Sequence, residues 1–276
     1  MKISQRLSAA ILASLVILFL SGCAKTHKIA ITAHRGYWKC EEAKGAQNSV
    51  ASFRLAQEFG LWGSEFDVRL TKDDKVVVNH DEDINGKRVR DFDYEEIKDE
   101  KLSNGESLCT LEDYFEQGTK SKYTVLVLEL KPMGSDDADE ILIQKNLQTL
   151  KDFGLYDPDK VIFISFSLYS CKRIAELCPG FTNQYLSGDI APSELNAMGI
   201  NGIDYEQGVF FEHPEWVKEA HNLGMSVNVW TVDSEENMVR LADLGVDCIT
   251  TNEPALCRKV LGKAELRKTR KSREIK

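Results

Sequence analysis

The sequence predicts an α/β protein, a (β/α)8 TIM barrel with a small insertion after strand 2, from two observations. Short β-rich segments alternate with amphipathic segments along the chain after residue 27, which is typical of repeated βα units around a parallel sheet. The β-rich segments number eight, and a barrel of this type needs about 250 residues. The chain of 276 residues has 254 once a leader of 22 is removed.

The eight expected strands are separated by segments with helical periodicity. Three helices are each followed directly by a glycine, a residue that often ends a helix, and they span 48–59, 214–223 and 234–244. A short run at 75–79 is expected to pair with the second strand as a hairpin. The strands are expected at 28–33, 64–70, 124–131, 160–165, 182–186, 200–204, 225–231 and 246–251.

Two segments depart from this alternation. Residues 81–107 are polar, carry two Asn-Gly turn signals and lack an apolar run long enough for a core, which indicates an insertion after the second barrel strand. Residues 263–276 hold seven Lys or Arg against two Glu and predict a basic, solvated tail, for which contact with anionic lipid stays open. The barrel domain is therefore placed at 23–262.

The charge balance restricts the partners. Lys and Arg number 35 and Asp and Glu 44, a net charge of -9, and residues 1–262 carry -14 when the basic tail is set aside. An acidic body argues against nucleic acid as a partner. It also repels phosphate at long range, so a bound phosphate group needs a metal ion or a few placed cations. No pattern in the sequence indicates an oligomeric state.

The first 22 residues are expected to form a lipoprotein signal peptide. Lys2 and Arg6 precede an apolar run at 7–20, which at fourteen residues is short for a membrane span. The run ends in LSGC, which resembles the bacterial lipobox, where the cysteine, here Cys23, is lipidated and becomes the first mature residue. We expect an exported bacterial lipoprotein, anchored to a membrane through Cys23 and facing the periplasm or the cell surface; an uncleaved anchor is the alternative.

Three carboxylates are expected at the carboxyl-terminal end of the barrel, where β/α barrels hold their active sites. Glu65 and Asp67 lie two apart on the second strand, so both face the interior, and Glu129 does so on the third. Grouped, buried carboxylates repel one another and lose their hydration, and a cation among them would offset both costs. All-oxygen ligands favour one divalent cation, Ca²⁺ or Mg²⁺, over zinc, with positions left for water and a phosphate oxygen.

Two histidines and two cationic residues accompany these carboxylates. His34 follows the first strand directly, and His80 ends the hairpin. On opposite sides of a metal-bound phosphate, two imidazoles suit in-line displacement, because one can take a proton from the nucleophile while the other gives one to the leaving alkoxide. Arg35 can contact two phosphate oxygens at once, and Lys131 adds a point charge.

The ordered motifs resemble those of the glycerophosphodiester phosphodiesterase family across nearly the whole expected mature chain. They are HRG at 34–36, EFDV at 65–68, HD at 80–81, ELK at 129–131, SFS at 165–167, WTV at 230–232 and TTNEP at 250–254. The chain departs from the family pattern in two places: Ala46-Gln47 stands where Pro-Glu is usual, and Asn252 where Asp is usual. Both changes lower the negative charge modestly.

The resemblance implies a barrel enzyme that hydrolyses glycerophosphodiesters to glycerol 3-phosphate and an alcohol. It implies that the general acid and base are His34 and His80. It also implies that the metal ligands are Glu65, Asp67 and Glu129. The implied substrate contacts are Arg35, Lys131 and Trp230.

Two alternative functions stay open. The same architecture serves phosphodiesterases that act on lipids, either sphingomyelinase D-like or phospholipase C-like, and a lipid tether would favour membrane substrates by proximity. Against this, the sequence shows no exposed apolar or aromatic cluster that would insert into a bilayer. The second alternative is a surface lipoprotein that binds phosphodiesters without turnover, for which the replacements at Gln47 and Asn252 leave room.

Overall fold

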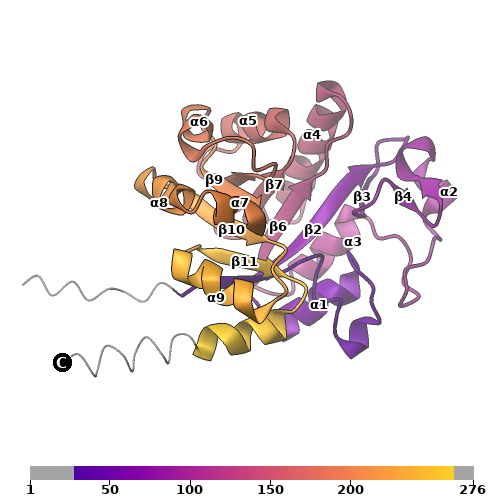
Figure 1. Ribbon diagram of the computed structural model, residues 1–276. Helices are drawn as coiled ribbons and strands as arrows, with labels where there is room; N and C mark the ends of the chain where they lie inside the picture. The colour runs from indigo at the N-terminus through magenta and orange to yellow at the C-terminus, as the bar shows by residue number, and fades with distance from the viewer. Residues whose placement is uncertain (1–27, 264–276) are drawn as a thin grey trace, which may run out of the picture.

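In the computed structural model, which describes residues 28–263, eight parallel strands close into a barrel (Figure 1). The sheet closes because the first strand pairs in parallel with both the second strand and the last. All eight lie where the sequence predicts strands, so the predicted TIM barrel is confirmed. In order around the barrel they are β1 (Ala30–Ala33), β2 (Gly63–Leu70), β6 (Val125–Leu130), β7 (Val161–Ser165), β8 (Thr182–Tyr185), β9 (Gly202–Glu206), β10 (Ser226–Trp230) and β11 (Cys248–Thr251).

Helices follow the strands and cover the outside of the barrel (Figure 1). Serine side chains cap several first turns: Ser49 accepts a hydrogen bond from a backbone N–H of α1, and Ser234 does the same for α9. The left-handed Gly245, with φ of 91°, ends α9 as predicted. The helices are α1 (Val50–Glu58), α3 (Leu111–Gly118), α4 (Asp136–Asp152), α5 (Leu168–Leu177), α6 (Pro192–Ala197), α7 (Gln207–Glu212), α8 (Glu215–Asn222) and α9 (Glu235–Leu244), with a further helix at 254–263.

Side chains alternate along the strands between the helix-covered outside and the barrel interior. On β2, Phe66 and Val68 join a buried core with residues of α1, α3 and α4. Phe66 stacks on Tyr114 of α3 with ring centroids 4.4 Å apart, a contact that adds about 1 kcal/mol to the burial of the two rings. A second core lies between β9–β11 and the helices α8 and α9. The outward apolar residues fix the strand register and thereby turn the intervening carboxylates inward.

The insertion after β2 has more internal packing than its polar sequence suggests. β3 (Val76–Val78) pairs antiparallel with β2, as predicted for the hairpin. Four single apolar residues of the following segment pack against Val77 as a small core: Ile84, Val89, Ile97 and Leu108. Polar residues separate them in the sequence, so no continuous apolar run predicts this small core. The elements are β4 (Asp83–Ile84), β5 (Lys87–Arg88), η2 (Val89–Asp91) and α2 (Tyr94–Ile97); a short η1 (Glu41–Ala43) precedes α1.

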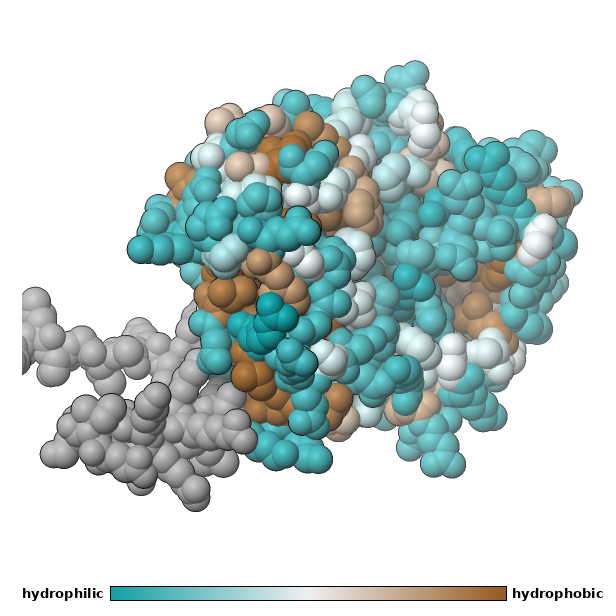
Figure 2. Space-filling model, viewed as in Figure 1, coloured by the Kyte–Doolittle hydropathy of each residue, from teal (hydrophilic) through white to brown (hydrophobic). Residues whose placement is uncertain are grey.

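On the face shown in Figure 2, hydrophilic residues dominate, and hydrophobic residues gather over α9 and the helix at 254–263. No helix within 28–263 is long and apolar enough to cross a membrane. The six cysteines in this range are free thiols, five of them buried. The predicted signal peptide at 1–22, the predicted lipidation site Cys23 and all of the basic tail except Lys263 lie outside the described residues.

Candidate active site

The three predicted carboxylates meet at the carboxyl-terminal end of the barrel. Asp67 on β2 is paired in register with Glu129 on β6, and Glu65 lies one inward position earlier on β2. One oxygen from each of the three lies within 4.8 Å of the others, and all three residues are buried. The sequence therefore predicted this cluster correctly, since the period of two along each strand and the parallel pairing of the two strands bring the side chains together.

Burial and mutual repulsion disturb the ionisation of the cluster. Loss of water raises the pKa of Glu65 well above its ordinary value, and the neighbouring charges of Asp67 and Glu129 raise it further. The same two causes, burial and the charge of Asp67, raise the pKa of Glu129 to about 8. Burial also opposes ionisation of Asp67, but Lys131 and His80 hold the pKa of its carboxyl below the ordinary value. Asp67 therefore favours its charged form, whereas Glu65 and Glu129 lack the positive charge that would keep them ionised.

The donor set fits a hard divalent cation. The Oε1 atom of Glu65 is buried and accepts no hydrogen bond from any residue in 28–263. The two cationic side chains in contact, Arg35 and Lys131, do not balance three carboxylates. Oxygen ligands at this spacing suit Ca²⁺ or Mg²⁺, which would restore the ionised form of Glu65 and Glu129.

Arg35 and Lys131 lie on opposite flanks of Asp67. The Lys131 Nζ atom is 2.7 Å from Glu129 Oε1 and 3.3 Å from Asp67 Oδ1. The Arg35 Nε atom is 3.8 Å from Asp67 Oδ2, and its Nη1 donates to Gln47 Oε1 at 2.7 Å. Gln47 therefore occupies the place of the family's usual glutamate as a neutral acceptor, which leaves the charge of Arg35 less neutralised.

The turn after β1 positions both His34 and Arg35. Arg35 and Gly36 have positive φ angles of 56° and 77°, and a Cβ on Gly36 would lie 2.3 Å from the hydroxyl oxygen of Ser52 in α1. The Arg35 backbone N donates to Glu65 Oε2 at 2.7 Å, so the turn is tied directly to the acidic cluster. Only glycine fits this close approach, which explains the third residue of the HRG motif.

The two histidines differ in their hydrogen bonds. His34 Nδ1 is 2.9 Å from Asn252 Oδ1, an atom that also accepts from Trp38 Nε1 at 3.1 Å. Burial, followed by the charge of Arg35, lowers the pKa of His34 to about 4. His80 is less buried, and its Nδ1 is 2.7 Å from Asp81 Oδ1. Burial lowers the pKa of His80, whereas the charge of Asp67 raises it.

A cavity of about 160 Å³ joins these groups. Both histidines, Arg35, Glu65 and Glu129 line it, together with the aromatic residues Trp230 and Phe166. The Trp230 indole is in edge contact with Phe166 at 5.6 Å, and its Nε1 donates to the Asp204 carbonyl oxygen at 2.9 Å. Trp230 is thus at the cavity, where a substrate contact was predicted.

Three polar residues at this end were missed from the sequence. Asp204 ends the predicted strand 200–204 and lines the cavity. Its Oδ2 accepts from Asn228 Nδ2 at 2.9 Å, and burial raises the pKa of Asp204 to about 8. Asn48 donates to Asp67 Oδ2 at 2.8 Å. Asp233 accepts from the side-chain amide of Asn252 at 2.8 Å. The rule that singled out Glu65, an acid on a barrel strand near its carboxyl end, applies equally to Asp204.

The fold and the site are those expected of a barrel enzyme that acts on phosphate esters, since one guanidinium and two carboxylates of the acidic cluster share a cavity with two imidazoles. The sequence pattern of the Glycerophosphoryl diester phosphodiesterase family matches residues 34–256. The chain belongs to this family, whose members are phosphodiesterases.

Individual relatives agree. A glycerophosphodiester phosphodiesterase of Caldanaerobacter subterraneus is 31% identical over 82% of this chain and 95% of its own length. The crystal structure of a glycerophosphodiester phosphodiesterase from Parabacteroides distasonis is 42% identical, covers 87% of this chain and 99% of its own, and has a TM-score of 0.83. An Oleispira antarctica phosphodiesterase, solved with sn-glycerol-3-phosphate as product, shares the fold at 22% identity and a TM-score of 0.71 over 84% of this chain and 96% of its own.

Proposed function

We propose that the protein hydrolyses glycerophosphodiesters to glycerol 3-phosphate and an alcohol, with a divalent cation held by Glu65, Asp67 and Glu129. The observation that carries the proposal is the convergence of this cluster with two histidines on one cavity. The family relatives, named glycerophosphodiester phosphodiesterases at 31% and 42% identity, support the substrate class. A bound Ca²⁺ or Mg²⁺ would supply positive charge to the phosphate oxygens.

His34 is assigned as the general base. Asn252 Oδ1 can only accept, so the Nδ1 of His34 donates to it and the Nε2 atom keeps its lone pair. A pKa of about 4 keeps this imidazole neutral at physiological pH. His34 Nε2 can therefore take a proton from the water that attacks phosphorus.

His80 is assigned as the general acid. Burial lowers the pKa of His80, and two carboxylates, Asp67 and Asp81, oppose this shift because they stabilise its protonated form. As the bond between phosphorus and the alcohol oxygen breaks, His80 gives its proton to the leaving alkoxide. Arg35 and Lys131 contact the remaining phosphate oxygens; the neutral Gln47, which accepts from Arg35 Nη1, leaves the positive charge of Arg35 available to the phosphate. Trp230 and Phe166 form the apolar wall against which the glycerol or the alcohol packs.

The expected location is a membrane-anchored, exported lipoprotein with Cys23 as its lipidated residue. The motif before Cys23 and the short apolar run support this. Detection of a diacylated Cys23 by mass spectrometry of the mature protein would test it, and an intact Met1 would contradict it.

The experiment for the activity uses the chain from residue 24, glycerophosphoethanolamine and either Ca²⁺ or Mg²⁺, with glycerol 3-phosphate measured as product. His34→Ala and His80→Ala are each expected to lower kcat by about 10²- to 10⁴-fold while metal still raises Tm. The control is His213→Ala, an exposed histidine that stacks on Trp216 away from the cavity. Binding of the diester without turnover in the wild type would favour a binding lipoprotein, and turnover only of intact phospholipid or sphingomyelin would favour a lipid phosphodiesterase.

A further inference from the structure

Exposed hydrophobic residues collect at the end of the barrel opposite the active site. Four large hydrophobic side chains of the described chain stand out as exposed: Trp62 (40%), Tyr123 (89%), Ile141 (36%) and Leu223 (40%). All but Ile141 lie in loops that lead into barrel strands, and these loops form the amino-terminal end. Trp62 and Tyr123 are on adjacent loops, because Gly63 pairs with Val125, whose N–H donates to the Trp62 carbonyl oxygen at 2.7 Å.

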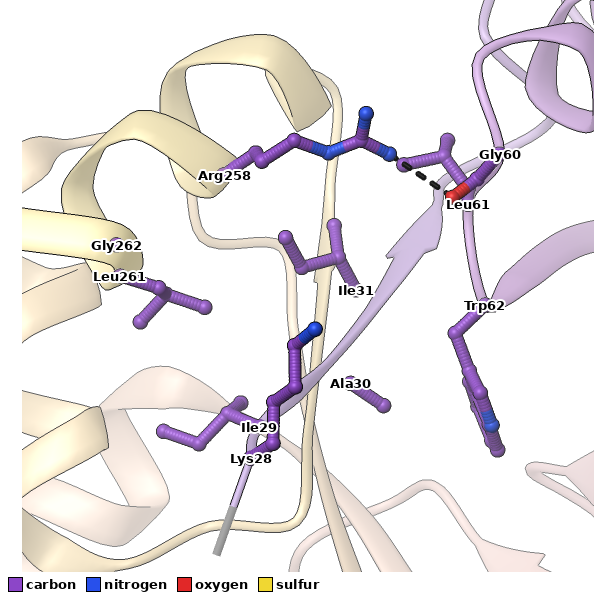
Figure 3. A pocket seen from close by; sticks show the side chains of 10 residues that line it. All are labelled: Lys28, Ile29, Ala30, Ile31, Gly60, Leu61, Trp62, Arg258, Leu261 and Gly262. Atoms are coloured by element: carbon purple, nitrogen blue, oxygen red, sulfur yellow. Dashed lines mark hydrogen bonds between the residues drawn. The ribbon is translucent and has the colours of Figure 1, made fainter. Parts of the chain in front are cut away.

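A groove of about 500 Å³ opens beside Trp62 (Figure 3). It runs between the start of β1, the Gly60–Trp62 loop and the helix at 254–263, with Ile29, Ile31 and Leu261 among its apolar walls. Lys28 and Arg258 add positive charge to it. Figure 3 shows Arg258 reaching across the groove to Gly60. The Nη2 atom of Arg258 donates to the carbonyl oxygens of Phe59 and Gly60 at 2.9 Å each. The groove thus combines an apolar wall with a fixed guanidinium, a pairing that suits an anionic amphiphile.

The loop beside Trp62 is also basic. Lys120 and Lys122 precede Tyr123; Lys120 is 3.7 Å from Glu116, and Lys122 forms no ion pair with any described residue. The loops at this end also hold three acids: Asp157, 3.6 Å from Lys160; Asp159; and Asp247, which accepts from His221 at 3.1 Å. The last helical turns add Glu58, 2.6 Å from Arg54, and Asp152, which accepts from Gln148 at 2.7 Å. The loop that carries Tyr123, residues 119–124, itself contains two lysines and no acidic residue.

Both ends of the described chain lie at this end of the barrel. Lys28 comes five residues after Cys23, so the two are at most about 18 Å apart when the chain between them is fully extended. The basic segment 264–276 follows the helix that forms one wall of the groove. An acyl anchor on Cys23 would therefore bring the Trp62 end of the barrel, rather than the active site, close to the bilayer.

We propose that this amino-terminal end, formed by Trp62, Tyr123, Lys28, Lys122 and Arg258, docks on an anionic lipid bilayer. Trp and Tyr rings favour the level of the lipid headgroups, and cationic side chains are attracted to an anionic leaflet. The two aromatic residues of this end, Trp62 and Tyr123, lie on loops that are far apart in sequence, so no single segment of the sequence reveals this surface.

Docking in this orientation also restricts the substrates to water-soluble ones, an inference that rests on the proposed function. Residues 28–34 run from the docking end to His34, and six residues of extended chain span about 20 Å. The cavity with His34 then opens away from the membrane, out of reach of phosphodiesters embedded in the same leaflet. The substrates are water-soluble, deacylated glycerophosphodiesters, and the anchor serves to hold the enzyme at the membrane.

The test uses the chain from residue 24, without lipid, and vesicles of phosphatidylcholine with or without phosphatidylglycerol. This chain retains the whole barrel, and the Parabacteroides distasonis protein, 99% of whose chain aligns with 87% of this one, crystallises as a folded protein. We expect sedimentation with the anionic vesicles only. Lys120→Gln/Lys122→Gln is expected to weaken binding about 25-fold, about fivefold for each lysine. Trp62→Ala/Tyr123→Ala is expected to weaken vesicle binding about tenfold, because roughly 60 Å² of aromatic surface would no longer be buried in the bilayer.

Matched controls change similar residues elsewhere on the barrel. Ile141→Ala in α4 removes the fourth exposed hydrophobic side chain, and Lys172→Gln in α5 removes an exposed lysine; neither is expected to alter binding. The proposal is overturned if the protein fails to bind anionic vesicles. It is also overturned if all variants bind equally, because the binding would then belong to the basic tail. A concentration-dependent dimer that dissociates on Trp62→Ala/Tyr123→Ala overturns it as well, because a second copy would then occupy the surface.

A second measurement separates this proposal from the activity. Wild type and Lys120→Gln/Lys122→Gln should hydrolyse glycerophosphoethanolamine in solution at equal rates, since the loop is distant from the cavity. With the lipidated protein in anionic vesicles, this soluble diester is expected to be cleaved and the vesicle phospholipid left intact. Cleavage of the vesicle phospholipid would overturn the inferred orientation. Vesicle binding without any diester hydrolysis would uphold the docking surface and refute only the proposed function.

Discussion

Removal of divalent cations should make the stability of this protein fall as the pH rises from about 4.5 to about 8. Glu129 has a pKa of about 8 in the folded chain, against 4.5 for an ordinary glutamate. Between these values the folded chain binds more protons than the unfolded chain, so its stability is full below pH 4.5 and declines as the pH approaches 8. The difference corresponds to about 5 kcal/mol from Glu129, and the raised pKa of Glu65 acts in the same direction.

A divalent cation should reverse this decline. Binding requires the ionised carboxylate, and at pH 7 a group with a pKa of 8 is about nine-tenths protonated. Apparent metal affinity should therefore rise about tenfold between pH 7 and pH 9 through Glu129 alone. The assay compares Tm in a chelator with Tm in millimolar Ca²⁺ or Mg²⁺ from pH 5 to pH 8. At about 2 to 4 °C per kcal/mol, the gain in Tm from the metal should grow by about 10 °C or more across this range.

Two variants show whether the acidic cluster is the cause. Glu129→Gln removes the titrating group, so the metal-free protein should be more stable at pH 8 than the wild type and should lose most of the gain from metal. Asp139→Asn is the matched control, a buried carboxylate that accepts hydrogen bonds from Met133 N at 2.7 Å and Ser167 Oγ at 2.6 Å; it should destabilise with or without metal. A metal-free Tm that is constant from pH 5 to pH 8, or an unchanged metal gain in Glu129→Gln, would refute the reasoning.

Three further changes have definite expected outcomes. Asp204→Asn removes a buried carboxyl with a pKa of about 8, so the dependence of Tm on pH between about 4 and 8 should flatten both with and without metal. Asn252→Asp would set two carboxylates in the 2.8 Å contact with Asp233 and should cost about 2 to 4 kcal/mol above pH 5, measured by urea unfolding. Gly36→Ala would place a Cβ 2.3 Å from a serine oxygen and should abolish hydrolysis by displacing the turn; Gly180→Ala, with a φ of 95° but open space around it, should cost only about 1 to 2 kcal/mol and keep activity.

The sequence determined the barrel and most of the site because both depend on local periodicity. Strands 28–33 and 246–251 are recognisable without knowledge of their partners, and the closure that joins them follows from the strand count. On β2, the two-residue period that puts Phe66 into the outer core also turns Glu65 and Asp67 inward. No long-range information is needed for these predictions.

Only the tertiary structure decided which residues are neighbours across the chain and how much water each one keeps. The small core of the insertion, the contact of His34 with Asn252 and the adjacency of Trp62 to Tyr123 each join segments that are separate in sequence. The raised pKa values of Glu65 and Glu129 likewise need the closed barrel, because an alternating pattern shows that a carboxylate points inward but not how completely its neighbours exclude water. Direction is a property of each strand, whereas burial and proximity arise only when all eight strands close.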